Sequence, residues 1–203
     1  PTRKVCKNCE FPIGFKKHDF LNHGIKYKIC RNCGHLNGEK EDSVEFANWF
    51  YKDDDGAKYL PHYIKDYEER VSKIYLPKAK YLVDTLSQIC NINKFSQYDM
   101  GCGGGHFVAA LSSLGVKAYG YDINKKLINL AKNVWEQNDK HSLDNPPFNT
   151  VASEEELIKK IKSSNVDVIS FIGVLEHLRN PNQALNAFHE SKAKYMFFCV
   201  PLF

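Results

Sequence analysis

A group of glycines and a later aspartate offer the clearest chemistry in this sequence. Gly101, Gly103 and Gly105 follow a segment expected to be a strand and precede one with helical periodicity. Because they lack side chains, backbone NH groups and a helix N-terminus can approach a bound ligand there. Asp122 lies 21 residues after Gly101, at the end of the next expected strand. A carboxylate at that place can accept hydrogen bonds from both hydroxyls of a ribose, so the pattern predicts a nucleoside-like cofactor.

The loop departs from the dinucleotide-binding fingerprint at one position. The pattern GxGxxG requires its third glycine at position 106, and His106 stands there. The sequence therefore disfavours a nicotinamide cofactor.

Four of the seven cysteines form two CxxC pairs near the N-terminus, Cys6 with Cys9 and Cys30 with Cys33. Two such pairs about 20 residues apart are typical of a four-cysteine zinc site, in which the closed shell makes the ion structural. A segment of about 40 residues buries too little apolar surface to fold alone, whereas zinc can contribute on the order of 10 kcal/mol. We expect residues 1–40 to form a zinc-binding module.

One histidine beside these pairs and the three remaining cysteines are also of types that can bind a metal. His35 is an alternative ligand beside Cys33, although a surface position is the commoner explanation for such a histidine. Cys90, Cys102 and Cys199 have no partner in the pattern, and we expect them to be buried small residues.

Composition and charge limit the kind of protein. The chain has 203 residues, 43% of them apolar, which suits one main domain with a small module. It has no secretory signal and no apolar run of about 18 residues, so we expect a cytoplasmic protein without a membrane partner. Residues 1–40 carry nine Lys/Arg and three acids, which gives this segment a net charge of +6. Because the whole chain has a net charge of +4, the remaining residues carry about −2. This excess favours either an anionic partner or a solvated face.

Residues 41–94 are expected to connect the module to the main domain. The Asp53–Gly56 run predicts a linker with a turn within residues 41–60. Helical periodicity then continues to residue 86 with an interruption at Pro77, which predicts two helices. Four side chains of this region either form a lid over an active site or, more commonly, pack the helices: Tyr59, His62, Tyr63 and Tyr67.

From residue 95 onward, strand and helix patterns alternate. Strands are predicted at 95–100, 116–121, 148–151, 166–172 and 194–200, with helices between them. The inward face of the helix after Asp122 is predicted to carry Leu127, Leu130, Ala131 and Val134. This order predicts an α/β fold, a parallel sheet with helices on both faces.

Three segments together resemble the signature of class I S-adenosylmethionine-dependent methyltransferases: Asp99 to Gly105, Gly120 to Ile123, and Asp167 to Leu178. The resemblance covers about residues 95–203 and implies a Rossmann-like sheet. It also implies that the methionine end of the cofactor is held by Asp99, Gly101, Gly103 and Gly105, the ribose by Asp122 and the adenine by Ile123, while Gly173 and Val174 border the methyl group. Members usually carry two strands beyond the fifth. Because Pro1 is not an initiator methionine and those strands are missing, we expect both ends to be trimmed.

A second motif points elsewhere. Asn145-Pro146-Pro147-Phe148 matches the NPPF box of amino-nitrogen methyltransferases letter for letter. In those enzymes the box follows the fourth strand, but here it precedes the third. We interpret it as a turn that leads rigidly into a strand.

Methyl transfer requires alignment of the acceptor and removal of its proton. His177 is the best placed histidine for a general base, and His106 and Tyr63 are less favoured. The alternative is that Glu176 and His177 form a structural hydrogen-bonding pair.

The arrangement of a four-cysteine module before such a domain resembles bacterial methyltransferases of sugar and polysaccharide biosynthesis. The resemblance implies a small-molecule acceptor, commonly a nucleotide-linked sugar. One alternative is an RNA methyltransferase whose basic module binds the phosphate backbone, and another is a non-catalytic cofactor-binding scaffold. The expected division is 1–40 for zinc, 41–94 for the linker and lid helices, and 95–203 for the truncated S-adenosylmethionine domain.

Overall fold

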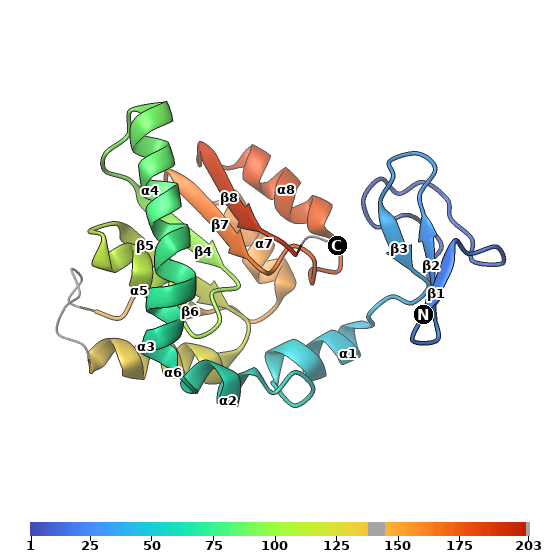
Figure 1. The fold of residues 1–203 in the computed structure, drawn as a ribbon, viewed down its shortest axis with the longest axis horizontal. Helices are drawn as coiled ribbons and strands as arrows, with labels where there is room; N and C mark the ends of the chain where they lie inside the picture. The colour runs from blue at the N-terminus through green and yellow to red at the C-terminus, as the bar shows by residue number, and fades with distance from the viewer. Residues whose placement is uncertain (138–144, 202–203) are drawn as a thin grey trace.

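A computed structural model describes residues 1–137 and 145–201 and shows a small N-terminal module beside a larger α/β domain (Figure 1). The end of the predicted 95–203 domain, residues 202–203, lies outside the described residues. Within the two described ranges, no helix has the length and apolar character needed to cross a membrane.

The larger domain is built on five parallel strands, as the sequence predicts, and their order in the sheet is β6-β5-β4-β7-β8. Their bounds are β4 (Ser96–Met100), β5 (Lys117–Asp122), β6 (Phe148–Thr150), β7 (Val168–Ile172) and β8 (Tyr195–Cys199). The chain leaves β4 for β5 on one side and returns to β7 on the other. A reversal of this kind opens a crevice at the carboxyl ends of the strands.

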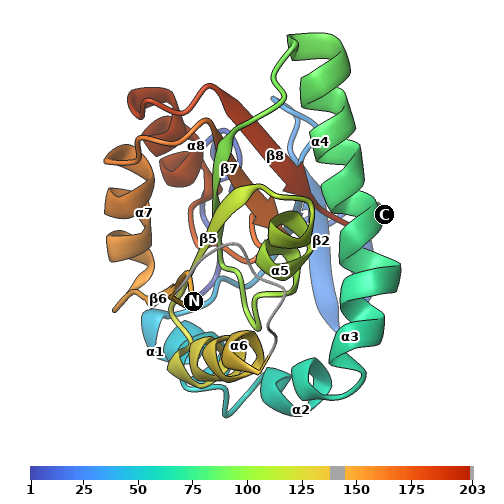
Figure 2. The ribbon, with the colours of Figure 1, turned by 90° about the vertical axis from the view of Figure 1, so that its left-hand side faces the viewer.

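Helices cover both faces of the sheet, which confirms the predicted fold class (Figure 2). One face carries α4 (Leu76–Cys90), α5 (His106–Ser113) and α6 (Lys125–Glu136), and its core includes Phe107 and Ile128. The other carries α7 (Glu154–Lys162) and α8 (Pro181–Glu190), with Ile161 in its core. Burial of these apolar side chains drives the layers together.

The predicted inward face of α6 is partly wrong. Leu127 and Ala131 are buried as expected, but Ile128 and Trp135 are buried where Leu130 and Val134 were predicted, and these two are half-buried. The buried face of α6 is turned relative to the predicted one, because the Trp135 ring packs edge-on against Phe148 of β6, with 5.6 Å between ring centroids.

The N-terminal module contains a three-stranded antiparallel sheet of β1 (Phe20–Asn22), β2 (Ile25–Ile29) and β3 (Leu36–Gly38). A bridge between Thr2 and Lys40 joins its two ends. Each cysteine pair lies in a tight turn closed by a hydrogen bond, from Glu10 N to Cys6 O and from Gly34 N to Cys30 O. Both donors have positive φ, so Gly34 supplies the expected backbone freedom and Glu10 adopts the same conformation without it.

The connecting region is more helical than predicted. Residues 41–60, expected as a linker, contain α1 (Val44–Ala47), the π-helical turn η1 (Asn48–Lys52) and the first residues of α2 (Tyr59–Ile64). The expected break at Pro77 is also wrong, because α3 (Tyr67–Arg70), η2 (Val71–Tyr75) and α4 run on continuously. The wider π turn comes directly before α4, so Pro77 lies where its missing NH is tolerated.

Candidate functional site

A cavity of about 520 Å³ opens at the carboxyl ends of β4, β5 and β7, a size typical of small-molecule sites. The structure brings together seven of the predicted site residues in its wall: Gly101, Gly103, Asp122, Ile123, Gly173, Val174 and His177. Two further predicted cofactor residues, Asp99 and Gly105, are not part of the wall.

Asp122 is held in the wall by two backbone hydrogen bonds. It is 8% exposed, and its two carboxylate oxygens accept hydrogen bonds from Gly103 N and Asn124 N, both at 2.7 Å. Burial raises the pKa of Asp122, while these backbone donors oppose the shift. The carboxylate therefore fixes the glycine loop to the end of β5 and keeps lone pairs for a ligand hydroxyl.

Gly101 and Gly103 leave room for neighbouring side chains at the cavity. Both have positive φ, of 76° and 54°. A Cβ at Gly101 would lie 2.7 Å from Val174, and one at Gly103 would lie 2.8 Å from the Tyr63 ring. A side chain at either position would displace part of the cavity wall.

Gly105 serves packing instead of the cavity. A Cβ there would lie 2.5 Å from the Phe148 ring and 3.0 Å from Ala131 Cβ. The residue also has φ of 79° at the start of α5. Its missing side chain lets the loop close against β6 and α6, so Gly105 lies behind the residues that line the cavity.

Asp99 lies on β4 behind the cavity wall, and its side chain contacts the neighbouring strand β7. It pairs in register with Ser170 of β7, whose Oγ lies 2.5 Å from the Asp99 carboxyl and 2.5 Å from Gln97 Nε2. Burial raises the pKa of Asp99 to about 7, helped by the nearby Asp122 and opposed by the Ser170 hydrogen bond. The side chain thus joins β4 to β7 under the site.

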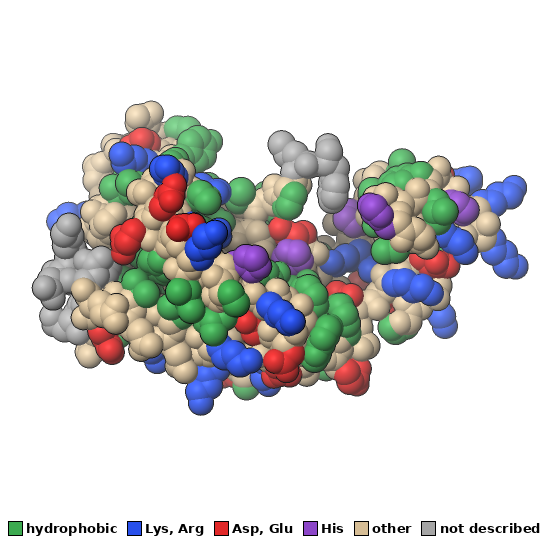
Figure 3. All heavy atoms as spheres, turned by 60° about the horizontal axis from the view of Figure 1, so that its bottom comes forward, with side chains coloured by type: hydrophobic (Ala, Val, Ile, Leu, Met, Phe, Trp, Pro, Cys, Tyr) green, Lys and Arg blue, Asp and Glu red, His purple; other side chains and the backbone are tan. Residues whose placement is uncertain are grey.

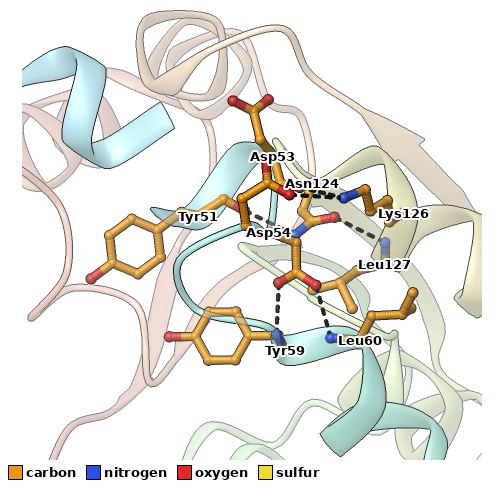
Figure 4. A network of polar contacts seen from close by, with 9 residues as sticks. Tyr51, Asp53, Asp54, Tyr59, Leu60, Asn124, Lys126 and Leu127 are labelled. Atoms are coloured by element: carbon orange, nitrogen blue, oxygen red, sulfur yellow. Dashed lines mark hydrogen bonds and ion pairs between the residues drawn. The ribbon is translucent and has the colours of Figure 1, made fainter. Parts of the chain in front are cut away.

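The segment that precedes α2 is attached to the β5–α6 turn by a polar network (Figure 4). Asp54 accepts hydrogen bonds from Tyr59 N at 2.7 Å and Leu60 N at 3.0 Å, which caps α2. Asn124 Nδ2 donates to Tyr51 O at 2.8 Å, and Lys126 Nζ donates to Asp53 O at 2.6 Å. The Asp53–Gly56 run, predicted as a simple turn, thereby positions the side chains on either side of it over the cavity.

Of the four residues weighed as a lid, Tyr59 and Tyr63 line the cavity. His62 is exposed, and Tyr67 donates from its hydroxyl to Gly104 O at 3.0 Å. The His106 ring is buried against Tyr67 and Tyr75, with centroids 4.1 and 5.1 Å away. Burial lowers the pKa of His106 to about 4, so the ring is neutral. This neutral ring packs the residues around Tyr67 and Tyr75 against the glycine loop.

His177 makes two polar contacts at the cavity. Its Nδ1 lies 3.1 Å from the Tyr51 hydroxyl, and its Nε2 lies 3.9 Å from Glu176 Oε1. Burial raises the pKa of Tyr51 to about 12, so the phenol keeps its proton at neutral pH. His177 therefore has a fixed partner from a segment 126 residues away.

Several wall residues were missed from the sequence: Ala47, Tyr51, Tyr75, Lys78, Asn124, Glu154 and Cys199. Cys199 and Cys90 are half-buried, in contrast to the expected full burial, whereas Cys102 is buried. Asn124 had a detectable signal as a cap residue just after Asp122. Tyr51 had none, because its place depends on how the segment folds back. The Asn145–Phe148 motif leads into β6 away from the cavity wall, as interpreted.

The four N-terminal cysteines lie together. Their sulfur atoms are all within 4.8 Å of one another, and the Cys6–Cys33 and Cys9–Cys30 Sγ distances are both 3.6 Å. Zn–S bonds of about 2.3 Å in a tetrahedron require S···S distances of about 3.8 Å, so the set fits zinc. Burial alone raises the pKa of Cys6, but hydrogen bonds from the Cys9 backbone and Asn37 outweigh it and give about 6. His35 is not part of the cluster.

Solved structures of three methyltransferases are similar to this chain to different degrees. The plantazolicin methyltransferase BamL, in complex with a triazolic desmethylPZN analog and SAH, shares 22% identity at a TM-score of 0.51. The match covers 71% of this chain and 51% of BamL. BpumL in complex with SAH shares 20% at 0.48, covering 70% and 50%. The bifunctional kinase-methyltransferase WbdD shares 23% at 0.39, covering 54% and 22%. BamL supports the fold, and the chain spans about half the length of the plantazolicin enzymes.

The fold and the cavity together define the class I methyltransferase architecture. The profile described as "Methyltransferase domain" matches residues 65–202, which is more than half of the chain. The chain belongs to this methyltransferase domain family. A comparison with curated proteins finds no match.

The raised pKa of Asp99 predicts a pH-dependent stability. Because the folded pKa of about 7 exceeds the usual value of 3.8, the native state holds a proton that the unfolded state releases. The free energy of unfolding contributed by Asp99 should fall as pH rises from about 4 to about 7. An Asp99→Asn variant cannot lose this contribution, so its stability relative to the parent should rise across that range. Urea unfolding at a series of pH values measures this, with Glu136→Gln as the control. Equal pH slopes for Asp99→Asn and the parent would contradict the burial effect.

The cysteine cluster predicts one bound zinc per chain. Cys30 is 2% exposed within the set, so Cys30→Ser should lose the metal and unfold the module, whereas Cys199→Ser should keep it. Elemental mass spectrometry of the purified proteins measures the metal content. Clearly less than one zinc in the parent protein would rule out the site.

Proposed function

We propose that this chain binds S-adenosylmethionine in the 520 Å³ cavity and transfers its methyl group to a small-molecule acceptor. The observation that carries the proposal is the meeting of the glycine loop, Asp122 and His177 in one cavity wall. The membership of residues 65–202 in a methyltransferase domain family supports it.

Each wall residue then has a chemical task. Asp122 accepts hydrogen bonds from the ribose hydroxyls with the lone pairs that the two backbone donors leave free. Ile123 offers an apolar surface to the adenine, and Gly101 and Gly103 let the backbone approach the methionine end. Gly173 and Val174 border the methyl group, while Asp99 holds the strands beneath.

S-adenosylmethionine supplies a methyl group already activated by its sulfonium. The protein must align the acceptor and remove its proton. In our proposal His177 is the base: in the tautomer that carries its proton on Nδ1, the ring donates to the Tyr51 oxygen and Nε2 can accept the acceptor's proton. Tyr51 is thus a positioning residue that orients the His177 ring.

For the acceptor, we propose a sugar linked to a nucleotide. Tyr51, Tyr59 and Tyr63 bring aromatic rings to the cavity wall, which suit the face of a sugar ring or a base. The module beside them exposes basic side chains that suit phosphate (Figure 3). These are Lys4, Lys16, Lys17, Arg31 and Lys40. In this proposal residues 1–40 are the zinc module, 41–94 the lid and 95–203 the cofactor domain.

The acceptor class is tested by incubating the protein with methyl-labelled S-adenosylmethionine and, separately, a panel of nucleotide sugars, peptides and structured RNA. We expect label in a nucleotide sugar. Label in RNA alone would replace the acceptor proposal with the nucleic-acid alternative. No transfer to any of them, with S-adenosylhomocysteine still bound, would favour the scaffold.

The base is tested by His177→Ala. General-base catalysis contributes about 10²–10⁴-fold, so turnover should fall by that order while the affinity for S-adenosylhomocysteine changes little. His189→Ala, an exposed histidine of α8, is the matched control. Full turnover in His177→Ala would exclude the role.

A further inference from the structure

The turn between Cys6 and Cys9 reaches across to the cavity wall. Lys7 Nζ donates to the carbonyl oxygen of Glu176 at 2.9 Å. Asn182 at the start of α8 donates from Nδ2 to Asn8 O at 2.5 Å. Both residues enclosed by the cysteine pair are therefore hydrogen-bonded to the segment that follows β7, although nearly the whole chain separates them in sequence.

The cavity wall at this point consists of the Val174–Leu178 segment. Val174, Glu176, His177 and Leu178 all line the cavity. The segment lies in a turn between β7 and α8, held internally by hydrogen bonds from His177 N and Leu178 N to Val174 O, at 2.9 and 3.2 Å. The Lys7 contact adds an external hold on the peptide unit directly before His177.

The same turn is connected back to the cysteine cluster. Lys7 N donates to Asn37 Oδ1 at 2.9 Å, and Asn37 Nδ2 donates to Cys6 Sγ at 3.4 Å and to His35 O at 2.9 Å. Asn37 is 1% exposed. Partners of metal ligands hold those ligands in orientation. Here one such partner also fixes the backbone that carries Lys7.

We propose that the Cys6–Cys9 turn is a positioning clamp, in which Lys7 holds the Val174–Leu178 segment and Asn8 holds the start of the helix that follows it, so that metal loading is coupled to the order of the cavity wall. A continuous path of hydrogen bonds runs from Cys6 Sγ through Asn37 and Lys7 to Glu176 O. Lys7 acts through this peptide and is a positioning residue. The inference rests on the proposed zinc site and cofactor cavity, but its measurement needs no methyl transfer.

Amide hydrogen exchange at His177 and Leu178 reports on the clamp directly. Lys7→Met keeps the apolar stem and removes the donor. A hydrogen bond from a charged donor is commonly worth about one factor of ten or more, so exchange in the 174–178 segment should become about tenfold faster. Lys16→Met, which removes an exposed lysine of the same module, should leave the rate unchanged.

Two further measurements complete the test. Removal of zinc from the parent protein by a chelator should accelerate exchange in the same segment and weaken binding of S-adenosylhomocysteine several-fold. Asn182→Ala removes the second contact from α8, outside the cysteine cluster, so it should raise exchange with the metal retained.

The outcomes separate the clamp from the other proposals. Unchanged exchange in Lys7→Met with zinc bound would overturn the clamp. If Lys7→Met instead lost zinc, unchanged exchange in Asn182→Ala would overturn it and faster exchange would support it. If zinc removal accelerated exchange in the 174–178 segment of a protein that transfers no methyl group, the proposed function would be refuted and the clamp would be supported.

Discussion

The paired hydrogen bonds from Gly103 N and Asn124 N to the Asp122 carboxylate hold the rest of the site together. Burying a carboxylate is unfavourable, and its raised pKa reflects that cost. The two backbone donors offset part of it and also set the shape of two turns. One turn is the glycine loop after β4, and the other begins α6. The cavity exists because both turns are fixed to one side chain.

The segment before α2 depends on the same interaction through Asn124. Asn124, positioned by Asp122, accepts from Leu127 N to cap α6 and donates to Tyr51 O. Tyr51 in turn meets His177 across the cavity. On the other side, Tyr63 lies against Gly103. Residues from 41 to 75 thus enclose a site whose floor belongs to the sheet, and the module's Lys7 supports the wall opposite.

Contiguous motifs allowed much of this to be predicted from the sequence. The glycine loop, Asp122 and the succession of strands and helices follow local patterns along the chain, so the fold and the part of the wall that belongs to these motifs were found. The cysteine pairs could be recognised in the same way, because metal geometry restricts their spacing. Gly105 and Asp99 were predicted to bind ligand from the same motif, and the structure adds contacts that the motif does not show, with Phe148 and with Ser170. A glycine or an acid in a loop does not reveal which neighbour it faces.

Tertiary contacts account for what the sequence did not predict. Tyr51 reaches the cavity only because Asp54 caps α2 and turns the segment back. The continuous helix through Pro77 depends on a π turn that periodicity does not show. Lys7 looked like one of nine basic residues in a charged module, and its partner is a carbonyl 169 positions away.

The claim on which everything else depends is that Asp122 holds both the loop and the ribose. Calorimetric titration of S-adenosylhomocysteine into the parent protein and an Asp122→Asn variant tests it most directly. We predict one site per chain in the parent and a loss of affinity of at least about tenfold in the variant, because one buried charged acceptor is removed. Equal affinity of the two proteins, or no binding by the parent, would contradict the account.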